Sequence, residues 1–169
     1  MTVDSFKFLP RLIAMFYRMT KREPQTPIPW TPLGRPLSEC IFGLVTSGGL
    51  YPRGAGHPFD VERERQEPTW GDPSFQVIPS DIESSAVGVS HLHFNTTDVE
   101  ADFNILLPIH RFLTLVEEGR IGGLAASNYS FMGYQGFPPD PTDWEERFGP
   151  EVAEAFINEG ANCVLLTPA

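Results

Sequence analysis

Two uninterrupted apolar runs constrain the fold of this 169-residue chain more than any other feature. Residues 40–46 (CIFGLVT) and 163–167 (CVLLT) contain no charged side chain. Such runs are typical of strands covered on both faces, as in parallel sheets flanked by helices. A Ser-Gly-Gly turn ends the first run and a proline follows the second. We therefore expect two buried strands that are far apart in the sequence.

Amphipathic helices are expected in the second half of the chain. Residues 109–118 carry apolar side chains at spacings of three and four and end at a glycine. A second helix begins at Thr142, with Glu145 three positions later as a capping pair, and residues 149–150 (Gly-Pro) interrupt it. The buried stripe of this second helix is expected to consist of Val152, Ala153, Phe156 and Ile157.

Three weaker strand signals and one long loop complete the pattern. Residues 75–78 and the small-residue segment 123–128 are predicted strands, and residues 87–94 alternate as a half-buried strand does. Residues 51–73 are polar and show no periodicity, so we expect a long loop there.

The order helix, strand, helix, strand implies parallel strands joined by right-handed crossovers. We therefore predict an α/β fold with a doubly wound, mainly parallel sheet, incomplete at its C-terminal end. The predicted organisation is an amphipathic arm over residues 1–22, a proline-rich linker over 23–37, and the N-terminal part of an α/β domain over 38–169.

The N-terminal arm differs in charge from the rest of the chain. Residues 1–22 carry five Lys or Arg side chains and one Asp. The arm would dock on the domain or on a partner subunit, or else lie on a membrane surface. No apolar run approaches the roughly 20 residues that span a bilayer, and no segment has the form of a secretory signal. We expect a soluble cytoplasmic protein.

Charge and cysteine content exclude several function classes. The net charge is −10, from 12 basic and 22 acidic side chains, which disfavours a nucleic-acid partner. The two cysteines cannot form a disulfide framework or a four-thiolate zinc site. Cys40 and Cys163 lie in apolar runs, where a thiol is expected to be inert.

Ligands of doubly wound sheets bind beyond the carboxyl ends of the strands. The turn after residue 46 and the end of the 123–128 strand should meet there, together with the C-terminal residues. The turn is either a plain tight turn or an anion site built from backbone N–H groups. No residue is assigned a catalytic or metal-binding role. The residues expected to line a substrate pocket are Ser47, Gly48, Gly49, His91, His93, Asn95, Asp98, Asn128 and Tyr129.

The two neighbouring histidines allow three interpretations. On a strand, His91 and His93 would point to the same side and could chelate a metal, with Asp98 or Asp102 as a third ligand. They could instead contact a substrate or partner, or have a purely structural role. A metal-binding or metal-dependent hydrolase domain is therefore kept as an alternative function.

Five segments together resemble the selenoprotein B family of glycine, sarcosine, betaine and D-proline reductases, and most of all its selenocysteine-containing branch that acts on D-proline. They occur in the order found in the family and cover about residues 27–169. The segments are PIPWTPLGRPL, GLVTSGGLY, DVEADFNILLPIHRFLTLVEEGRIGGLA, YSFMGYQG and GPEVAEAFINEGANCVLLTPA.

The resemblance implies a reductase that cleaves a carbon–nitrogen bond of an amino acid or amine. It also implies a partner subunit with a pyruvoyl group, a dithiol reductant, and a hetero-oligomeric assembly. In the family, a selenocysteine or cysteine follows the strand that matches residues 163–167. That position would come after Ala169, so Cys163 is not its counterpart.

We therefore expect that a UGA selenocysteine codon follows codon 169 and was read as a stop, which would leave the chain inactive alone. A further alternative is a non-catalytic interaction subunit that docks through residues 1–22.

Overall fold

The computed structural model describes residues 31–54, 58–67 and 69–169, together with Arg11 and Met15. The chain divides into residues 1–34 and residues 35–169, and the fold below is that of the second unit. The predicted arm, apart from those two residues, and most of the predicted linker lie outside the described residues. None of the helices in the described parts is long and apolar enough to cross a membrane.

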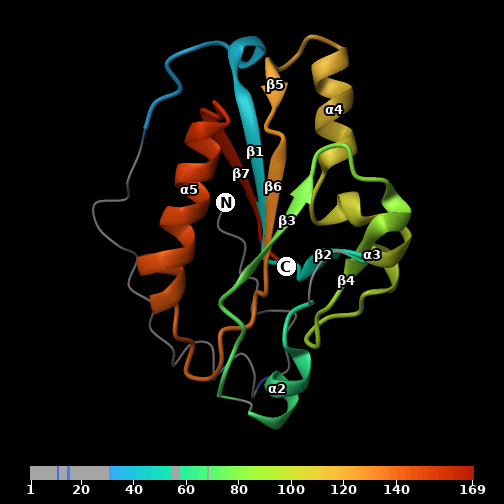
Figure 1. Ribbon diagram of the computed structural model, residues 1–169, viewed down its shortest axis with the longest axis vertical. Helices are drawn as coiled ribbons and strands as arrows, with labels where there is room; N and C mark the ends of the chain where they lie inside the picture. Colours follow the sequence, from blue (N-terminus) through green and yellow to red (C-terminus); the bar gives the residue numbers. More distant parts are fainter. Residues whose placement is uncertain (1–10, 12–14, 16–30, 55–57, 68) are drawn as a thin grey trace. The chain divides into compact units, whose positions relative to one another are not determined.

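A five-stranded, mostly parallel sheet forms the centre of this unit (Figure 1). The central strand β1 (Ile41–Thr46) pairs in parallel with β7 (Cys163–Thr167) along one edge. Along its other edge it pairs in parallel with β5 (Gly123–Leu124) and then with β6 (Ser127–Phe131). Strand β3 (Phe75–Pro79) is antiparallel to β6.

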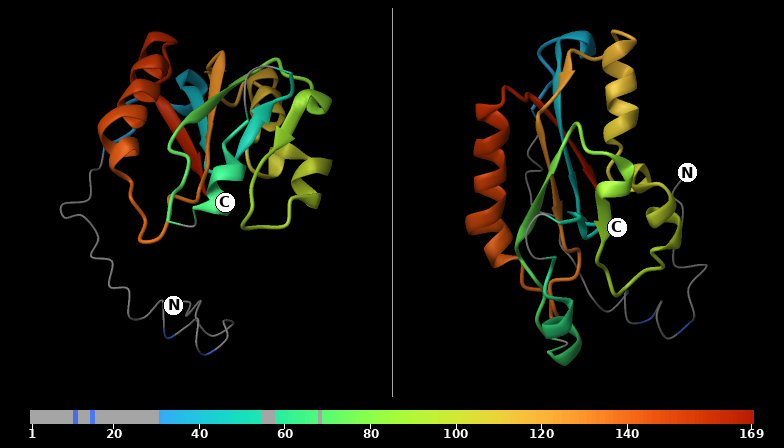
Figure 2. Two further views of the ribbon diagram at one scale, coloured as in Figure 1. Left: turned by 60° about the horizontal axis from the view of Figure 1, so that its bottom comes forward. Right: turned by 45° about the vertical axis from the view of Figure 1, so that its right-hand side comes forward.

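Helices cover both faces of the sheet, which confirms the predicted α/β class (Figure 2). Helix α5 (Gly149–Asn158) lies on one face and α4 (Ile109–Glu117) on the other. The α4 side also carries α3 (Thr97–Ala101) and a small two-stranded sheet, in which β2 (Leu50–Pro52) pairs antiparallel with β4 (Val87–Val89). Short 3-10 turns span Leu37–Glu39, Ser84–Ala86 and Phe103–Ile105.

Each face has its own hydrophobic core. The core under α4 contains Leu44, Leu50, Ile78, Val87, Val99, Phe103, Leu107 and Ile109. The core under α5 contains Ala125, Tyr129, Phe131, Val152 and Phe156.

Helix α5 packs on β1 through a narrow stripe. Val152 and Phe156 are buried, and a Cβ added at Gly43 would lie 2.3 Å from the Phe156 ring, so the close approach requires glycine there. The predicted stripe was too wide. Ala153 and Ile157 face away from the sheet, and Ile157 is 72% exposed.

The start of this helix also differs from the prediction. Asp140, not Thr142, supplies the cap: its Oδ1 accepts hydrogen bonds from the Thr142 backbone N–H (3.1 Å) and hydroxyl (2.6 Å). The predicted break at residues 149–150 is absent, because a π-helical turn, Trp144–Phe148, leads directly into α5. Pro150 lies in the first turn of α5, directly after the π-helical turn.

Strand β7 was predicted to be buried on both faces, and this is wrong. Among the described residues it pairs with β1 alone, so it forms an edge of the sheet. Leu165 packs against the core under α4, whereas Val164 and Leu166 on the other face are 50% and 69% exposed. A continuous apolar run cannot distinguish a central strand from an edge strand.

The predicted long loop, residues 51–73, contains regular structure. Residues of β2 open it, and α2 (Val61–Gln66) follows. Asp60 caps α2 by accepting a hydrogen bond from the Arg63 N–H, and Arg63 also pairs with Glu67 at 3.2 Å. Apolar periodicity did not reveal this helix because local caps and charge pairs stabilise it instead.

Two other strand predictions need correction. The strand predicted over residues 87–94 ends at Val89, so His91 and His93 do not lie on a strand. The strand predicted over residues 123–128 is two strands, β5 and β6, and β6 continues to Phe131. Asn128 and Tyr129 therefore lie inside β6 and not beyond its end.

The side chain of Asn128 bridges the interruption between β5 and β6. Its Oδ1 accepts a hydrogen bond from the Leu44 N–H (3.1 Å), and its Nδ2 donates to Ser80 Oγ (2.8 Å). Asn128 is fully buried. An amide side chain thus satisfies a backbone group of β1 that the neighbouring ladder leaves unpaired.

We predict that Asn128→Ala lowers the free energy of unfolding by about 2–4 kcal/mol, because it leaves the buried Leu44 N–H without an acceptor. Urea denaturation followed by circular dichroism measures the change. Asn158→Ala, at an exposed position near the end of α5, is the matched control and should change stability by less than about 0.5 kcal/mol. Equal losses in the two variants would contradict the role assigned to Asn128.

Candidate functional site

The carboxyl ends of β1 and β7 meet at one edge of the sheet. The Thr46 hydroxyl and the Ser47 N–H both donate to the Thr167 carbonyl oxygen, at 2.9 and 3.3 Å. The Ala169 N–H donates to Ser47 Oγ at 3.0 Å. These bonds place the end of β7 directly beside the turn that follows β1, as the strand order predicted.

An apolar cleft of about 440 Å³ opens at this edge. Its walls come from the ends of β1, β6 and β7 and from the start of the α5 helix. The lining residues are Val45, Thr46, Ser47, Phe131, Trp144, Gly149, Leu166, Thr167 and Pro168. We refer to this space as the β1–β7 cleft. Its chemistry suits the carbon skeleton of a small ligand.

Trp144 is the largest side chain of the β1–β7 cleft. Its indole packs edge-on against Phe131, with ring centroids 5.5 Å apart. The indole Nε1 is buried and has no hydrogen-bond acceptor among the described residues. The sequence analysis missed both residues, since neither belongs to a polar motif.

The turn of Ser47, Gly48 and Gly49 is a tight structural turn. Gly49 has φ +66°, and a Cβ there would lie 2.4 Å from the Ser90 carbonyl oxygen, so this position requires glycine. The Gly48 N–H donates to Thr46 Oγ1 and the Gly49 N–H to the Phe131 carbonyl. With the Ser47 N–H also bonded within the protein, the turn leaves none of these three N–H groups for an anion.

His91 and His93 lie in the segment that follows β4. The His93 N–H donates to His91 Nδ1 at 3.1 Å, and the two rings are perpendicular, with centroids 5.7 Å apart. The ring of His91 packs against Phe94 at a tilt of 40°, whereas that of His93 stacks on Tyr134 with ring centroids 4.2 Å apart. In the described part of the chain, no group of three or more His, Cys, Asp or Glu side chains is arranged to hold a metal ion.

Glu64 is the partner of His93, and the sequence analysis did not find it. Glu64 Oε1 lies 2.5 Å from His93 Nε2, and the Glu64 side chain is only 1% exposed. Its second oxygen, Oε2, is buried and has no partner among the described residues. In the sequence VERERQ this glutamate resembles its solvated neighbours, so only the tertiary structure reveals its position.

The remaining predicted pocket residues do not reach the β1–β7 cleft. Asn95 Oδ1 accepts hydrogen bonds from the Thr97 N–H and hydroxyl, and Asp98 is exposed in the first turn of α3. Asn128 is bonded to β1 as described above. Tyr129 lies in the core under α5, where burial raises the pKa of its hydroxyl.

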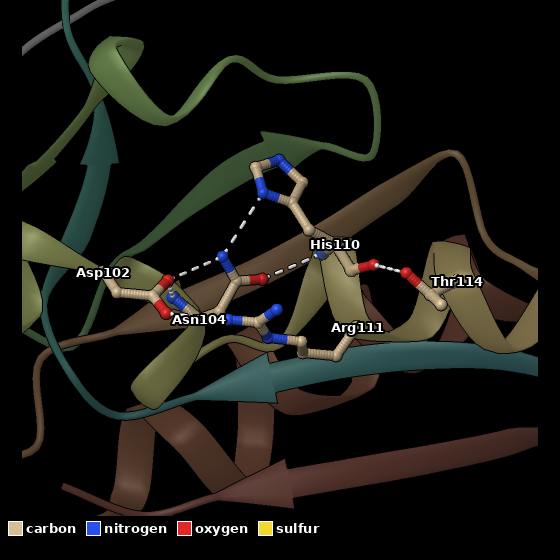
Figure 3. Close-up of polar contacts among 5 residues, drawn as sticks. All are labelled: Asp102, Asn104, His110, Arg111 and Thr114. Carbon is tan, nitrogen blue, oxygen red and sulfur yellow. Dashed lines mark hydrogen bonds and ion pairs between the residues drawn. The ribbon is translucent and has the colours of Figure 1, made fainter.

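A separate polar cluster fixes the start of α4 (Figure 3). Asn104 Oδ1 accepts from the His110 N–H at 2.9 Å, and Asn104 Nδ2 donates to Asp102 Oδ1 at 2.9 Å. Arg111 pairs with Asp102 at 3.1 Å. The hydrogen bonds from Asn104 and the pairing with Arg111 lower the pKa of Asp102. This carboxylate is therefore committed to the helix start and does not approach His91 or His93 as a metal ligand.

The two cysteines lie at the opposite end of the strands from the cleft. Cys163 is the first residue of β7, and Cys40 precedes β1. Burial and a hydrogen bond with Cys40 raise the pKa of the Cys163 thiol. Among the described residues, no thiol borders the β1–β7 cleft.

Burial, and the nearby charge of His93, lower the pKa of His91 to about 4. Between pH 6.5 and 4 the unfolded chain therefore binds more protons at this residue than the folded chain does. The contribution of His91 to the free energy of unfolding is complete above about pH 6.5 and is lost as the pH falls toward 4.

We predict that His91→Asn, which keeps an acceptor for the His93 N–H, reduces the loss of stability between pH 7 and pH 4.5. Urea denaturation at the two pH values measures it. Leu92→Ala, a neighbouring exposed change without a titrating group, should retain the wild-type pH dependence. Identical pH dependence in His91→Asn and wild type would show that His91 does not titrate as stated.

Comparison with known proteins agrees with the resemblance noted in the sequence. The chain is 38% identical over 145 residues to the D-proline reductase subunit gamma of Acetoanaerobium sticklandii, which covers 85% of this chain and 55% of that protein. It is 26% identical over 140 residues to the glycine reductase complex component B subunit gamma of Carboxydothermus hydrogenoformans, which covers 83% of this chain and 30% of that protein.

The chain thus spans about half of one curated relative and less than a third of the other. No solved structure matches it. The family model for glycine/sarcosine/betaine reductase selenoprotein B matches residues 17–169. This chain therefore belongs to the glycine/sarcosine/betaine reductase selenoprotein B family.

Proposed function

We propose that this chain forms part of a reductase subunit that cleaves a carbon–nitrogen bond of an amino acid or amine, with the β1–β7 cleft as its substrate site. The observation that carries the proposal is the convergence of β1 and β7 at this cleft, where Thr46 and Ser47 bond to the end of β7. The names of the relatives, a D-proline reductase subunit and a glycine reductase component, support the reaction class.

The overall reaction needs two electrons and two protons. A dithiol supplies both and becomes a disulfide, while the carbon–nitrogen bond is replaced by one C–H and one N–H bond. A selenol or thiol would carry the electrons to the substrate. Neither Cys40 nor Cys163 borders the cleft, so we propose that the selenol or thiol comes from outside the 169 residues.

The residues of this chain would bind and orient the substrate. Val45, Phe131 and Leu166 present carbon surface, which would bury the carbon skeleton of the substrate and exclude water. The hydrogen bonds of Thr46 and Ser47 hold the end of β7 in a fixed position, so that a reactive group delivered there would meet the substrate in a defined geometry.

A partner subunit is part of the proposal. The family resemblance implies a pyruvoyl group on another subunit, and this group would activate the substrate amine. The cleft itself contains no Lys, Arg, His, Asp or Glu side chain. Activation of an amine would therefore need a group from outside this cleft lining, and we assign that role to another subunit of a hetero-oligomeric enzyme. No observation favours the alternative of a metal-dependent hydrolase.

Blocking the cleft tests the proposal. In the subunit purified with its partners, Leu166→Trp should lower kcat/KM for D-proline reduction by dithiothreitol at least about tenfold, because the indole would occupy the cleft. Val164→Trp is the matched control. It lies on the same face of β7, is also exposed, and does not line the cleft. Its kcat/KM should stay within about twofold of wild type.

The measurements separate a wrong cleft assignment from a wrong function. Equal activity in the two tryptophan variants would remove the cleft from the proposal. A wild-type complex that reduces none of D-proline, glycine, sarcosine or betaine would contradict the proposed function and favour a non-catalytic interaction subunit.

A further inference from the structure

An aromatic pair forms one wall of the β1–β7 cleft. Phe131 at the end of β6 and Trp144 in the π-helical turn both line the cleft, and their ring centroids are 5.5 Å apart at an interplanar angle of 70°. Phe131 is only 8% exposed and belongs to the core under α5. Because close packing holds such a ring in one rotamer, the wall is a fixed aromatic surface.

The position of Trp144 is maintained against two unfavourable local features. The residue begins a π-helical turn, a rare form of helix that occurs frequently at functional sites. Its indole Nε1 is buried and has no acceptor among the described residues, although buried N–H groups are otherwise nearly always bonded. A purely apolar side chain would fill the same wall without the unpaired N–H. Together these features indicate that an indole at this place has a function.

Glycine is required where the π-helical turn meets α5. The Gly149 N–H donates to the Trp144 carbonyl oxygen, and a Cβ at Gly149 would lie 2.5 Å from that oxygen. Gly149 also lines the cleft. The turn that carries Trp144 and the cleft wall therefore share a residue without a side chain, and this shared residue keeps the indole beside the cleft.

The hydroxyl groups of the cleft lining are already bonded within the protein. The Thr46 hydroxyl donates to the Thr167 carbonyl oxygen at 2.9 Å, and Ser47 Oγ accepts from the Ala169 N–H at 3.0 Å. The Thr167 hydroxyl donates to the Val45 carbonyl oxygen at 3.1 Å. The lining also contains no carboxylate and no imidazole. A primary ammonium group, with three N–H donors, would therefore lose its hydration there without gaining a charged acceptor.

A nitrogen that carries carbon substituents suits these surroundings better. Its methyl or methylene groups bury apolar area, and its positive charge is attracted to the faces of aromatic rings, most strongly to that of tryptophan. It also has fewer N–H groups that lose hydrogen bonds to water. D-proline, sarcosine and betaine have such a nitrogen, whereas the nitrogen of glycine carries no further carbon.

We propose that Trp144 is a specificity-determining residue of the β1–β7 cleft and that it selects amino acids with an alkylated nitrogen over glycine. The inference rests on the proposed function and names the substrate class of the same cleft. The wall formed by Trp144 and Phe131 contacts the alkylated nitrogen. The substrate carboxylate stays hydrated at the open side of the cleft, where Leu166 is 69% exposed.

The test uses the subunit purified in complex with its partners and dithiothreitol as the reductant. The value of kcat/KM is measured for D-proline, sarcosine, betaine and glycine. In the wild-type complex, the best of the three alkylated substrates should exceed glycine by about 30-fold or more. We call this quotient the selectivity ratio. It needs no variant, so it tests the inference even if a substitution at Trp144 prevents folding.

Substitutions at Trp144 separate selectivity from packing. Trp144→Leu should reduce the selectivity ratio at least about tenfold, whereas a loss of packing alone would lower kcat/KM for all four substrates together. Trp144→Phe keeps an aromatic ring and should retain more of the ratio than Trp144→Leu. Trp70→Leu is the matched control, because it removes an indole that lies 4.2 Å from the Arg63 guanidinium and does not line the cleft, so the ratio should not change.

A failure of this inference differs from a failure of the proposed function. If the wild-type complex reduces glycine as efficiently as the alkylated amino acids, the inference is wrong and the proposed function stands. The same conclusion follows if Trp144→Leu keeps the wild-type selectivity ratio. A Trp144→Leu complex that keeps its circular dichroism and melting temperature but loses the ratio supports the inference. A wild-type complex that reduces none of the four substrates contradicts both.

Discussion

The arrangement of this sheet depends on polar side chains that take the place of missing backbone partners. Asn128 accepts from Leu44 where β5 gives way to β6, and Ser130 Oγ accepts from the Leu50 N–H at 2.7 Å. At the carboxyl ends of β1 and β7, the Thr46 hydroxyl donates to the Thr167 carbonyl, and the Thr167 hydroxyl donates to the Val45 carbonyl. An unpaired buried backbone group costs about 1–3 kcal/mol, so each of these contacts specifies one strand register.

The same contacts produce the cleft. They place the end of β7 beside the turn of β1, while the α5 helix approaches β1 closely because residue 43 is glycine. The π-helical turn before that helix then supplies Trp144 to the cleft wall. The site is thus built from segments that are distant in the sequence and that meet only after the parallel strands have paired. The segment that carries His93 is joined to the same turn, because the Ser90 N–H donates to the Gly49 carbonyl at 2.8 Å.

Periodicity predicted much of the fold. The apolar runs correspond to β1 and β7, and the spacing in residues 109–118 corresponds to α4. The predicted meeting of the β1 turn with the end of β7 was also correct. Errors arose where local signals were weak or misleading: α2 is stabilised by charge pairs, β4 ends before the histidines, and Asn128 lies within a strand. None of these follows from apolar spacing.

By itself, the sequence determined the fold class and the family, and it predicted that the turn after β1 meets the end of β7, because apolar periodicity and family motifs are local in the chain. Only the tertiary structure decided which residues occupy that end. It exposed one face of β7, committed Asn95 and Asn128 to structural hydrogen bonds, and paired Glu64 with His93. The reason is physical: the burial of a carboxylate, or the partner of an amide, depends on the segments that pack against it, and these come from other parts of the chain.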